Sequence, residues 1–350
     1  MMVLGIETSC DETSAALVVD GRHPLSNVVS SQVELHRPHG GVVPEIAARA
    51  HLENLVPVVV EALSGHRPDL IAVTVGPGLV GSLVVGVSAA KAMAWAWEVP
   101  LVGVNHLHAH IFAPVLEGAL PDFPFLALVV SGGHTLLAEV RSVIDMELLG
   151  ETRDDALGEA YDKVSVFLGL GYPGGPAIDE IAGKGDRRLI SLPRPMISSG
   201  DFNFSLSGLK TAVIREVTGS KRVSGKKVPG PRTGLDVRDV AASFQAAALE
   251  VVVRKTVRAA LDRGLSRVVI GGGVACNRAL RRDLRSECER LGLSPVFPSP
   301  SLCTDNAAMV AALGYYRYLA GHRAGLGIDV YPNLGFSENM PDGRSDLQGR

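Results

Sequence analysis

The sequence predicts an α/β fold of two similar lobes with a central cleft between them. Short apolar or β-branched runs alternate with helical patterns, and one order of elements (hairpin, strand, glycine-rich turn, helix) occurs twice. A chain of 350 residues that is 46% hydrophobic is long enough for two cores. We expect a first lobe of residues 1–113 completed by the C-terminal helix at 304–335, a second lobe of residues 114–303, and a flexible tail at 336–350.

The first copy of this order lies in the first hundred residues. Its predicted elements are, in order, a hairpin with strands 3–7 and 15–19, a helix from Pro44 through Val59, a strand at 70–75, the glycine turn 76–82 and a helix to about Trp97. The hairpin turn, Thr8 to Thr13, is acidic and rich in hydroxyl groups.

The second copy repeats the order further along the chain. Its predicted elements are a hairpin with strands 125–130 and 135–140, a strand at 267–270, the glycine turn 271–277 and a helix from about Arg278. Asp236 or Asp239 can cap a long helix that runs to Gly264. Thr304 can cap the last helix, which runs to Tyr318.

Composition limits the location and the partners of the protein. The net charge is only −3, so a nucleic acid would have to be held by a local basic patch. The four cysteines show no C-x-x-C spacing, which argues against a disulfide framework and a thiolate zinc site. The longest apolar runs, such as 125–130, are shorter than the roughly 18 to 20 residues of a membrane span. The N-terminus has no signal pattern, and we expect a cytoplasmic protein without membrane contact.

Three histidines lie close together in the segment Asn105-His106-Leu107-His108-Ala109-His110. On a helix His106 and His110 are only about 40° apart, so both imidazoles can reach one metal ion. His108 points about 160° away and is better explained as a structural residue. Leu107 occupies the position where an H-E-x-x-H metalloprotease has its general base, so peptide hydrolysis is a poor fit.

Glycine-rich turns in both copies predict a nucleotide site. Backbone N–H groups and the positive dipole end at a helix N-terminus attract phosphate. A single turn is weak evidence, but four turns in corresponding positions around a cleft favour a nucleotide there. The sequence contains neither G-x-x-x-x-G-K-[ST] nor a G-x-G-x-x-G helix entrance after the first strand.

Several longer motifs follow one another from the first strand to about residue 320. They are residues 6–13, 76–86, 105–110, 131–135, 158–163, 171–176, 204–210 and 303–307. In sequence and order they closely resemble the TsaD family of tRNA threonylcarbamoyltransferases, formerly called O-sialoglycoprotein endopeptidases. Two positions depart from the family pattern: His108 stands where many bacterial members have Glu, and Asn203 replaces the Asp that commonly precedes Phe-Ser.

The resemblance implies an actin-like ATPase fold, of the ASKHA class of actin, sugar kinases and Hsp70, in agreement with the duplication. It implies an acyltransferase that moves a threonylcarbamoyl group from threonylcarbamoyl-AMP to N6 of adenosine 37, in the anticodon loop of tRNAs that read codons beginning with A. AMP is released. The implied partners are a smaller TsaB-type paralogue and a TsaE-type ATPase.

The metal ligands of the family correspond here to His106, His110 and Asp305. The implied metal is iron, with one Fe²⁺ per subunit, and Zn²⁺ or Mg²⁺ could occupy the site in crystals. Two imidazoles and one carboxylate leave coordination positions open, which suits Fe²⁺ or Zn²⁺ in the role of a Lewis acid.

The resemblance also implies the residues that bind the donor, which we expect at turns. They are Val129, Val130, Ser131, Gly132 and Gly133 for the phosphate and carbamoyl end, Asp162 and Asp179 for the ribose or adenine, Gly175 for a close backbone approach, and Asn277 for the nucleotide. Asp11 or Glu12 is our candidate general base, because we expect the acidic turn to face the cleft. The alternative is that both are ordinary solvated carboxylates.

The segment from 215 to 232 combines basic residues with Gly, Ser and Pro. The basic residues are Arg215, Lys221, Arg222, Lys226, Lys227 and Arg232. We expect a mobile loop that contacts phosphates of the anticodon stem, and a solvated loop is the alternative. Two other functions share the predicted fold: an ASKHA-type ATPase or sugar kinase, and a non-catalytic scaffold of a tRNA-modifying complex. Neither needs a metal site of two histidines and an aspartate.

Overall fold

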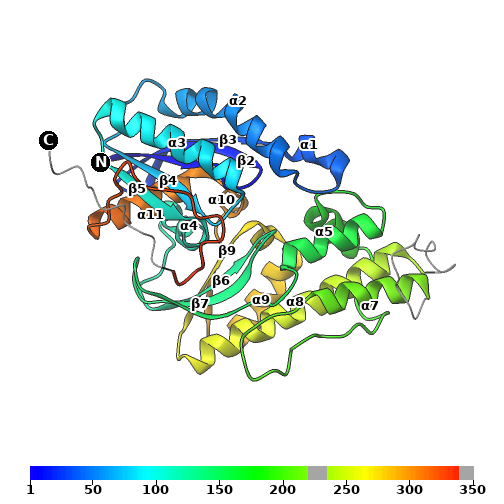
Figure 1. Cartoon of the computed structure of the whole chain (residues 1–350). Helices are drawn as coiled ribbons and strands as arrows, with labels where there is room; N and C mark the ends of the chain where they lie inside the picture. The colour runs from blue at the N-terminus through cyan, green and yellow to red at the C-terminus, as the bar shows by residue number, and fades with distance from the viewer. Residues whose placement is uncertain (220–234, 339–350) are drawn as a thin grey trace. The chain divides into compact units, whose positions relative to one another are not determined.

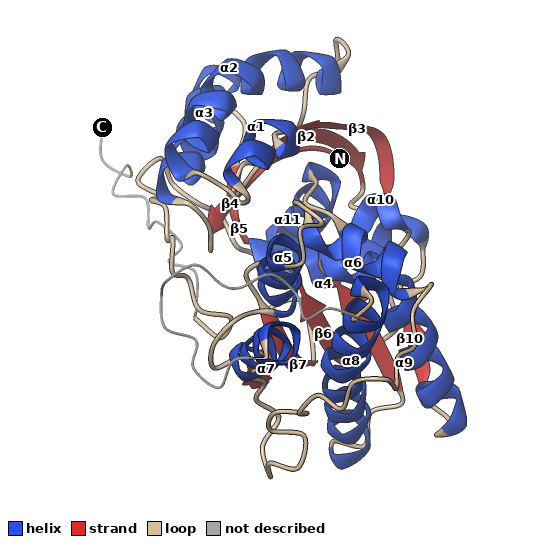
Figure 2. Cartoon of the chain, turned by 90° about the vertical axis from the view of Figure 1, so that its right-hand side faces the viewer, coloured by secondary structure: helices blue, strands red, loops and turns tan. Residues whose placement is uncertain are grey.

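The computed structural model describes residues 1–219 and 235–338, which form two compact units (Figure 1). The first unit contains Met1–Pro124, Val140–Glu147 and the described residues from Pro298 onward. The second contains Phe125–Glu139 and the described part of Leu148–Phe297. Each unit is built on its own five-stranded sheet, whose strands are red in Figure 2.

The two sheets share one topology. The first has the order β3-β2-β1-β4-β5 and the second the order β8-β7-β6-β9-β10. The strands are β1 (Met2–Glu7), β2 (Glu12–Val19), β3 (His23–Ser31), β4 (Leu70–Gly76), β5 (Leu101–Asn105), β6 (Phe125–Val130), β7 (Thr135–Val140), β8 (Met146–Glu151), β9 (Arg267–Gly271) and β10 (Ser294–Val296). β4 is parallel to β1 and β5, as β9 is to β6 and β10. This correspondence confirms the predicted duplication.

Helices pack on both faces of the first sheet, whose central strands β1 and β4 and edge strand β5 are buried on both sides, whereas β3 is largely exposed. The side chains of Leu4 and Ile6 belong to the core formed with α2 (Pro44–Leu63) and α3 (Val80–Trp97). Gly5, between them in sequence, faces α11 (Ala307–Leu319), where an added Cβ would lie 2.1 Å from the carbonyl oxygen of Ala307. The missing side chain at Gly5 therefore allows α11 to lie directly on β1.

Helix α3 corrects one expectation about apolar segments. Over its 18 residues it is long and apolar enough to cross a membrane by length and composition. In the structure it packs against β4 and α2, with Leu83, Val87 and Ala90 buried. One side of α3 therefore belongs to the core of the first unit, and the other side is exposed.

The remaining helices are short in the first unit and longer in the second. They are α1 (Val33–His36), α4 (His106–Phe112), α10 (Pro300–Cys303), α5 (Leu157–Phe167), α6 (Gly174–Ala182), α7 (Ser207–Thr218), α8 (Val237–Asp262) and α9 (Arg278–Arg290), with 3₁₀ turns at Arg37–His39, Ala113–Glu117 and Gly273–Cys276. Asp236 caps α8, which confirms one of the two predicted alternatives.

The predicted cap of the last helix was wrong. Thr304 does not begin α11; it ends α10 in an extended conformation. The cap is Asn306, whose side-chain oxygen accepts a hydrogen bond from the backbone N–H of Met309 at 3.1 Å. Both residue types are good caps, and the choice depends on which of them is extended just before the first helical residue.

Candidate functional site

Helix α4 presents two histidines because its start is fixed by a side-chain cap. β5 ends at Asn105, whose Oδ1 accepts a hydrogen bond from the backbone N–H of Leu107 at 2.9 Å. The helix therefore begins at His106, and His110 follows one turn later on the same side. The segment is helical, as the histidine spacing predicted.

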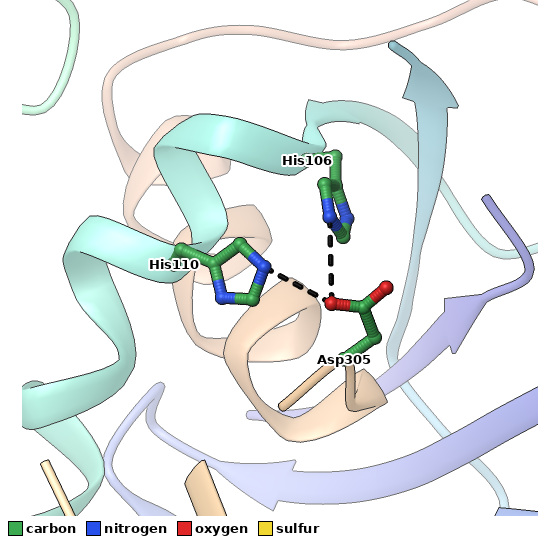
Figure 3. Close-up of side chains that lie close together, drawn as sticks. All are labelled: His106, His110 and Asp305. Atoms are coloured by element: carbon green, nitrogen blue, oxygen red, sulfur yellow. Dashed lines mark hydrogen bonds and ion pairs between the residues drawn. The ribbon is translucent and has the colours of Figure 1, made fainter. Parts of the chain in front are cut away.

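Asp305 lies between α10 and α11, far from the histidines in sequence. Its Oδ1 is 3.1 Å from His110 Nε2 and 3.5 Å from His106 Nε2 (Figure 3). These separations are close to the edge of about 3.3 Å of a tetrahedron with metal–ligand bonds near 2.05 Å. The structure thus brings together the three residues proposed as metal ligands, with ligand atoms within 4.8 Å of one another.

The carboxylate of Glu7, at the end of β1, contacts His106 on the ring nitrogen that does not face Asp305. Its Oε2 is 3.0 Å from His106 Nδ1 and accepts a hydrogen bond from Thr74 Oγ1 at 2.7 Å. Its Oε1 accepts one from the backbone N–H of Ser9 at 2.6 Å. Because an ionised carboxylate only accepts, Nδ1 of His106 must carry a proton, and Nε2 is the atom that faces Asp305.

The charges of this group are strongly coupled. Burial alone would raise the pKa of Glu7, but the charge of His106 and the hydrogen bonds from His106 and Thr74 hold that pKa below its ordinary value. Burial alone would lower the pKa of His106, but Asp305 and Glu7 raise it to about 9. Without a metal ion, His106 is therefore a cation between two carboxylates, a position that suits a metal cation equally well.

His110 is neutral in the same surroundings. Burial lowers its pKa, and the charge of His106 lowers it further, against the hydrogen bond with Asp305. Its other ring nitrogen, Nδ1, is buried and has no hydrogen-bond partner among the described residues. A neutral imidazole with one nitrogen aimed at a shared carboxylate is the form of histidine that binds metals. The donor set therefore fits the metal that the resemblance implies.

His108 points away from the group, as expected. Its Nε2 is 2.8 Å from the carbonyl oxygen of Phe336, and the two rings are in edge contact with centroids 4.7 Å apart. Burial lowers the pKa of His108 to about 4, so it is neutral and acts in packing. It links α4 to the segment that follows α11.

The acidic turn lies within electrostatic range of the same group. Burial, followed by the carboxylates Asp305 and Asp11, raises the pKa of Glu12 to about 10. Glu12 Oε1 accepts a hydrogen bond from Ser31 Oγ at 3.2 Å, and Asp11 is only 9% exposed. The two residues are therefore not ordinary solvated carboxylates.

The glycine turn 76–82 packs closely against the acidic turn Thr8 to Thr13, because Gly78 has no side chain. The backbone N–H of Leu79 donates to the carbonyl oxygen of Ser9 at 2.8 Å, and that of Gly78 to Pro332 at 3.0 Å. A Cβ on Gly78 would lie 2.5 Å from the same Ser9 oxygen. The amide of Leu79 thus holds the Thr8 to Thr13 turn and that of Gly78 holds the segment at Pro332, so both donate to backbone carbonyl groups of the protein.

In the second unit, the turn after β6 has exposed backbone at its two glycines. It is closed by a hydrogen bond of 2.8 Å from the backbone N–H of Ser131 to His134. A Cβ on Gly132 or Gly133 would meet nothing within 4 Å, so a ligand can approach the backbone closely. Val129 and Val130 belong to β6 and are buried, so only their backbone is available.

The other residues proposed for the donor lie mostly on helices, which corrects the expectation that they occupy turns. Asp162, on α5, accepts a hydrogen bond from the N–H of Gly174 at 2.6 Å. Gly175 is in the first turn of α6, with open space beside its Cα. Asp179, also on α6, pairs with Arg278 at 2.8 Å. Asn277 caps α9 and donates to Gln245 at 2.9 Å.

Most of the basic segment 215–232 lies outside the described residues. Of the six basic residues proposed to contact tRNA, Lys221, Arg222, Lys226, Lys227 and Arg232 lie outside the described residues. Arg215 is in the last turn of α7.

The residues that sequence reasoning missed are Glu7, Ser9 and Thr74. The available signal for Glu7 was a carboxylate in phase with buried residues at the end of a strand.

Comparison with known proteins gives a consistent result. The profile of the family described as "TsaD: tRNA N6-adenosine threonylcarbamoyltransferase" matches residues 23–312. The enzyme of that name from Symbiobacterium thermophilum is 51% identical over 339 residues, which are 95% of this chain and 96% of the relative. The one from Geobacter sulfurreducens is 52% identical over 338 residues, again 95% and 96% of the two chains.

Solved structures with low sequence identity support the fold. Full-length HypF in a phosphate- and nucleotide-bound form superposes with a TM-score of 0.58 at 12% identity, over 91% of this chain and 46% of HypF. The activator of 2-hydroxyisocaproyl-CoA dehydratase from Clostridium difficile gives 0.54 at 14% identity, over 92% and 96% of the two chains. Both have the actin-like ASKHA fold, which confirms the predicted fold class.

The position of Glu7 leads to a prediction about metal affinity. Glu7→Gln keeps the shape of the side chain but removes the charge that orients and polarises His106. We expect Zn²⁺, used as a redox-inert probe, to bind about 10 to 100 times more weakly in a chelator-competition titration.

The matched control is Thr74→Val, which removes one hydrogen bond to Glu7 but leaves the carboxylate. It should weaken binding much less. Zn²⁺ affinity equal to that of the original protein in Glu7→Gln, with an unchanged melting temperature, would show that Glu7 has no such role.

Proposed function

The chain belongs to the tRNA N6-adenosine threonylcarbamoyltransferase family, and we propose that it uses threonylcarbamoyl-AMP as donor and a metal ion held by His106, His110 and Asp305. Its activity is the transfer of a threonylcarbamoyl group to N6 of adenosine in tRNA. We further propose that the acceptor is adenosine 37 and that the enzyme works in the cytoplasm. No observation favours the ATPase, sugar-kinase or scaffold alternatives.

The reaction itself defines what the residues must do. The exocyclic amine of adenine is a poor nucleophile because its lone pair is delocalised into the ring. The acyl group must therefore arrive activated, as the mixed anhydride of a carbamate and a phosphate. The protein then has to position the donor, stabilise charge on the oxygens and remove a proton from the amine.

The metal proposal rests on the geometry of the triad. Three side chains from two distant segments place nitrogen and oxygen atoms 3.1 and 3.5 Å apart, around one shared carboxylate oxygen. Fe²⁺ is our preferred metal, from the resemblance and from the donor set. When bound, it would supply Lewis-acid stabilisation of negative charge on oxygen. Glu7 and Ser9 would keep His106 in the orientation that this role requires.

The second unit supplies the proposed contacts to the donor. The open backbone at Gly132 and Gly133 supports binding of a phosphate or carbamoyl oxygen by amide groups. Gly175, in the first turn of α6, supports a close approach by the nucleotide. Asp179 of α6 contacts Arg278, the residue that follows Asn277 at the start of α9. This proximity supports a joint role of Asp179 and Asn277 toward the ribose or base.

We retain Asp11 or Glu12 as the proton acceptor. With the pKa of Glu12 raised to about 10, its carboxyl group is protonated at neutral pH and cannot accept a proton in that state. Asp305 is one cause of this shift, and a cation bound to Asp305 would offset it. Glu12 is therefore suited to respond to metal binding, whereas Asp11 offers a second carboxylate in the same turn.

The metal proposal predicts that activity depends on a removable ion. We expect the chelator-treated protein, with its partner proteins, a supplied donor and unmodified tRNA, to form almost no modified nucleoside, and added Fe²⁺ to restore the reaction. Mass spectrometry of the tRNA nucleosides measures the product. His106→Ala should remain inactive after Fe²⁺ addition, and His66→Ala, at an exposed histidine of the same unit, should respond normally. Full activity after complete metal removal would contradict the proposal.

The base proposal predicts a rate effect in one of two variants. Loss of a general base usually costs about 10²- to 10⁴-fold, so Asp11→Asn or Glu12→Gln should lower kcat by that amount and leave KM for the donor nearly unchanged. Glu34→Gln, an exposed carboxylate of the same unit that pairs with Arg37, is the control. If both variants transfer at the original rate, the base is elsewhere.

An exposed apolar stripe on α2 supports the proposal of a TsaB-type partner. Leu52, Val56 and Val60 are 67%, 68% and 65% exposed and repeat every four residues along one side of the helix. Apolar side chains gathered on one helix face are typical of a protein–protein contact. We propose that the paralogue covers this stripe, and that a TsaE-type ATPase joins the complex.

The stripe predicts a specific loss of association. Leu52→Glu places a charge in the proposed contact, and we expect affinity for the purified TsaB-type paralogue to fall at least about tenfold in isothermal titration calorimetry. Leu319→Glu makes the same change at a site 61% exposed on α11 and should bind normally. Equal affinity of both variants would place the partner on another surface.

A further inference from the structure

Helix α9 carries a row of arginines on one side. Arg278, Arg281, Arg282 and Arg285 follow the spacing i, i+3, i+4, i+7, which keeps them within about 100° of one another. The opposite side packs into the second unit through Ala279, Leu280, Leu284 and Cys288. The arginines line a shallow hollow of about 390 Å³ together with Ser286 and Glu289.

This surface keeps a positive charge after its ion pairs are taken into account. Arg278 pairs with Asp179 at 2.8 Å, and Asp283 is shared by Arg282 at 2.9 Å and Arg187 at 3.0 Å. Arginines therefore outnumber the carboxylates Asp179, Asp283 and Glu289 around the hollow. An excess of guanidinium groups on a chain with a net charge of −3 is a local basic patch.

An aromatic ring lies beside the arginines. The guanidinium carbons of Arg281 and Arg285 are 5.2 and 5.5 Å from the ring centroid of Phe297, which is only partly buried. Guanidinium groups bind phosphate oxygens in a planar, two-pronged manner, and aromatic rings stack on unpaired bases. Their combination is more typical of a nucleic-acid surface than of a solvated helix face.

We propose that the arginine side of α9, extended by Phe297, is the surface that binds the phosphate backbone of the tRNA substrate. This inference rests on the transferase function. The arginine row begins at Arg278, next to Asn277, which we assign to the donor. The seven helical steps from Arg278 to Arg285 cover about 10 Å. At roughly 3.4 Å per nucleotide along a strand, this length can follow about three successive phosphates.

The test compares two double variants of the full chain. Arg282→Gln with Arg285→Gln removes two charges from the proposed surface. Arg238→Gln with Arg254→Gln removes two charges from α8, where each arginine pairs with a nearby carboxylate, Asp236 or Glu250. Binding of unmodified tRNA is measured by fluorescence anisotropy between 50 and 200 mM salt, and each protein is checked by its melting temperature.

We expect the α9 variant to bind roughly tenfold more weakly at low salt, with a log–log salt slope reduced by about 1.5 to 2, and the α8 variant to be unchanged. In the transfer assay KM for tRNA should rise while kcat at saturating tRNA stays the same. An unchanged slope, or equal losses in both variants, would overturn the proposal. Loss of a protein partner with normal tRNA binding would identify the surface as a protein contact and overturn it too.

A single substitution tests the role of the ring. Phe297→Leu keeps an apolar side chain but removes the stacking surface, so it should weaken binding of an anticodon stem–loop and leave binding of a loop-free stem duplex unchanged. Equal binding of the stem–loop would exclude stacking on Phe297. If the unaltered protein bound tRNA but transferred nothing, the proposed catalytic function would be contradicted instead, so the two failures can be distinguished.

Discussion

The arrangement of the first unit depends on one buried interaction, the contact between Glu7 and His106. A fully buried carboxylate is costly unless it is paired and hydrogen-bonded, and Glu7 receives His106, Thr74 and the N–H of Ser9. These partners come from α4, β4 and the turn after β1. Satisfying this one charge therefore fixes the ring of His106, the spacing of two strands and the entry to the acidic turn. Asp305 lies opposite Nε2 of the same ring, as the proposed metal site requires.

The duplicated topology accounts for where the functional residues lie. In open sheets with parallel strands, ligands bind at the carboxyl ends of the strands. Glu7 ends β1 and Asn105 ends β5 immediately before His106, while Val130 ends β6 just before the Ser131 turn. The same strand position thus carries different chemistry in each unit: buried charge and imidazoles in one, open glycine backbone in the other.

Local patterns in the sequence were sufficient for the elements but not for the site. Alternation and glycine turns predicted both hairpins, and the i, i+4 spacing predicted that His106 and His110 share a helix face. Asp305 had no local signal because its contacts depend on how α11 packs over Gly5, and only the resemblance indicated it. The cap at Asn306 and the helical positions of Asp162 and Asp179 were missed for a related reason. Cap residues and polar residues near glycine are compatible with turns and helices alike, and tertiary packing decides between them.

Electrostatics favours separate surfaces for the proposed metal ion and for the tRNA. Glu7, Asp11 and Asp305 gather negative charge around the histidines, and burial together with the charges of Asp305 and Asp11 raises the pKa of Glu12 to about 10, which keeps Glu12 neutral. Such a field favours a metal cation and repels phosphate. A chain with a net charge of −3 cannot attract RNA through its overall field. The proposed surface of α9 would meet this requirement locally, since its arginines concentrate guanidinium groups on a part of the second unit that contains none of these acidic residues. Segregation of opposite charges within one polypeptide thus lets a metal ion and a polyanion bind without competing for the same groups.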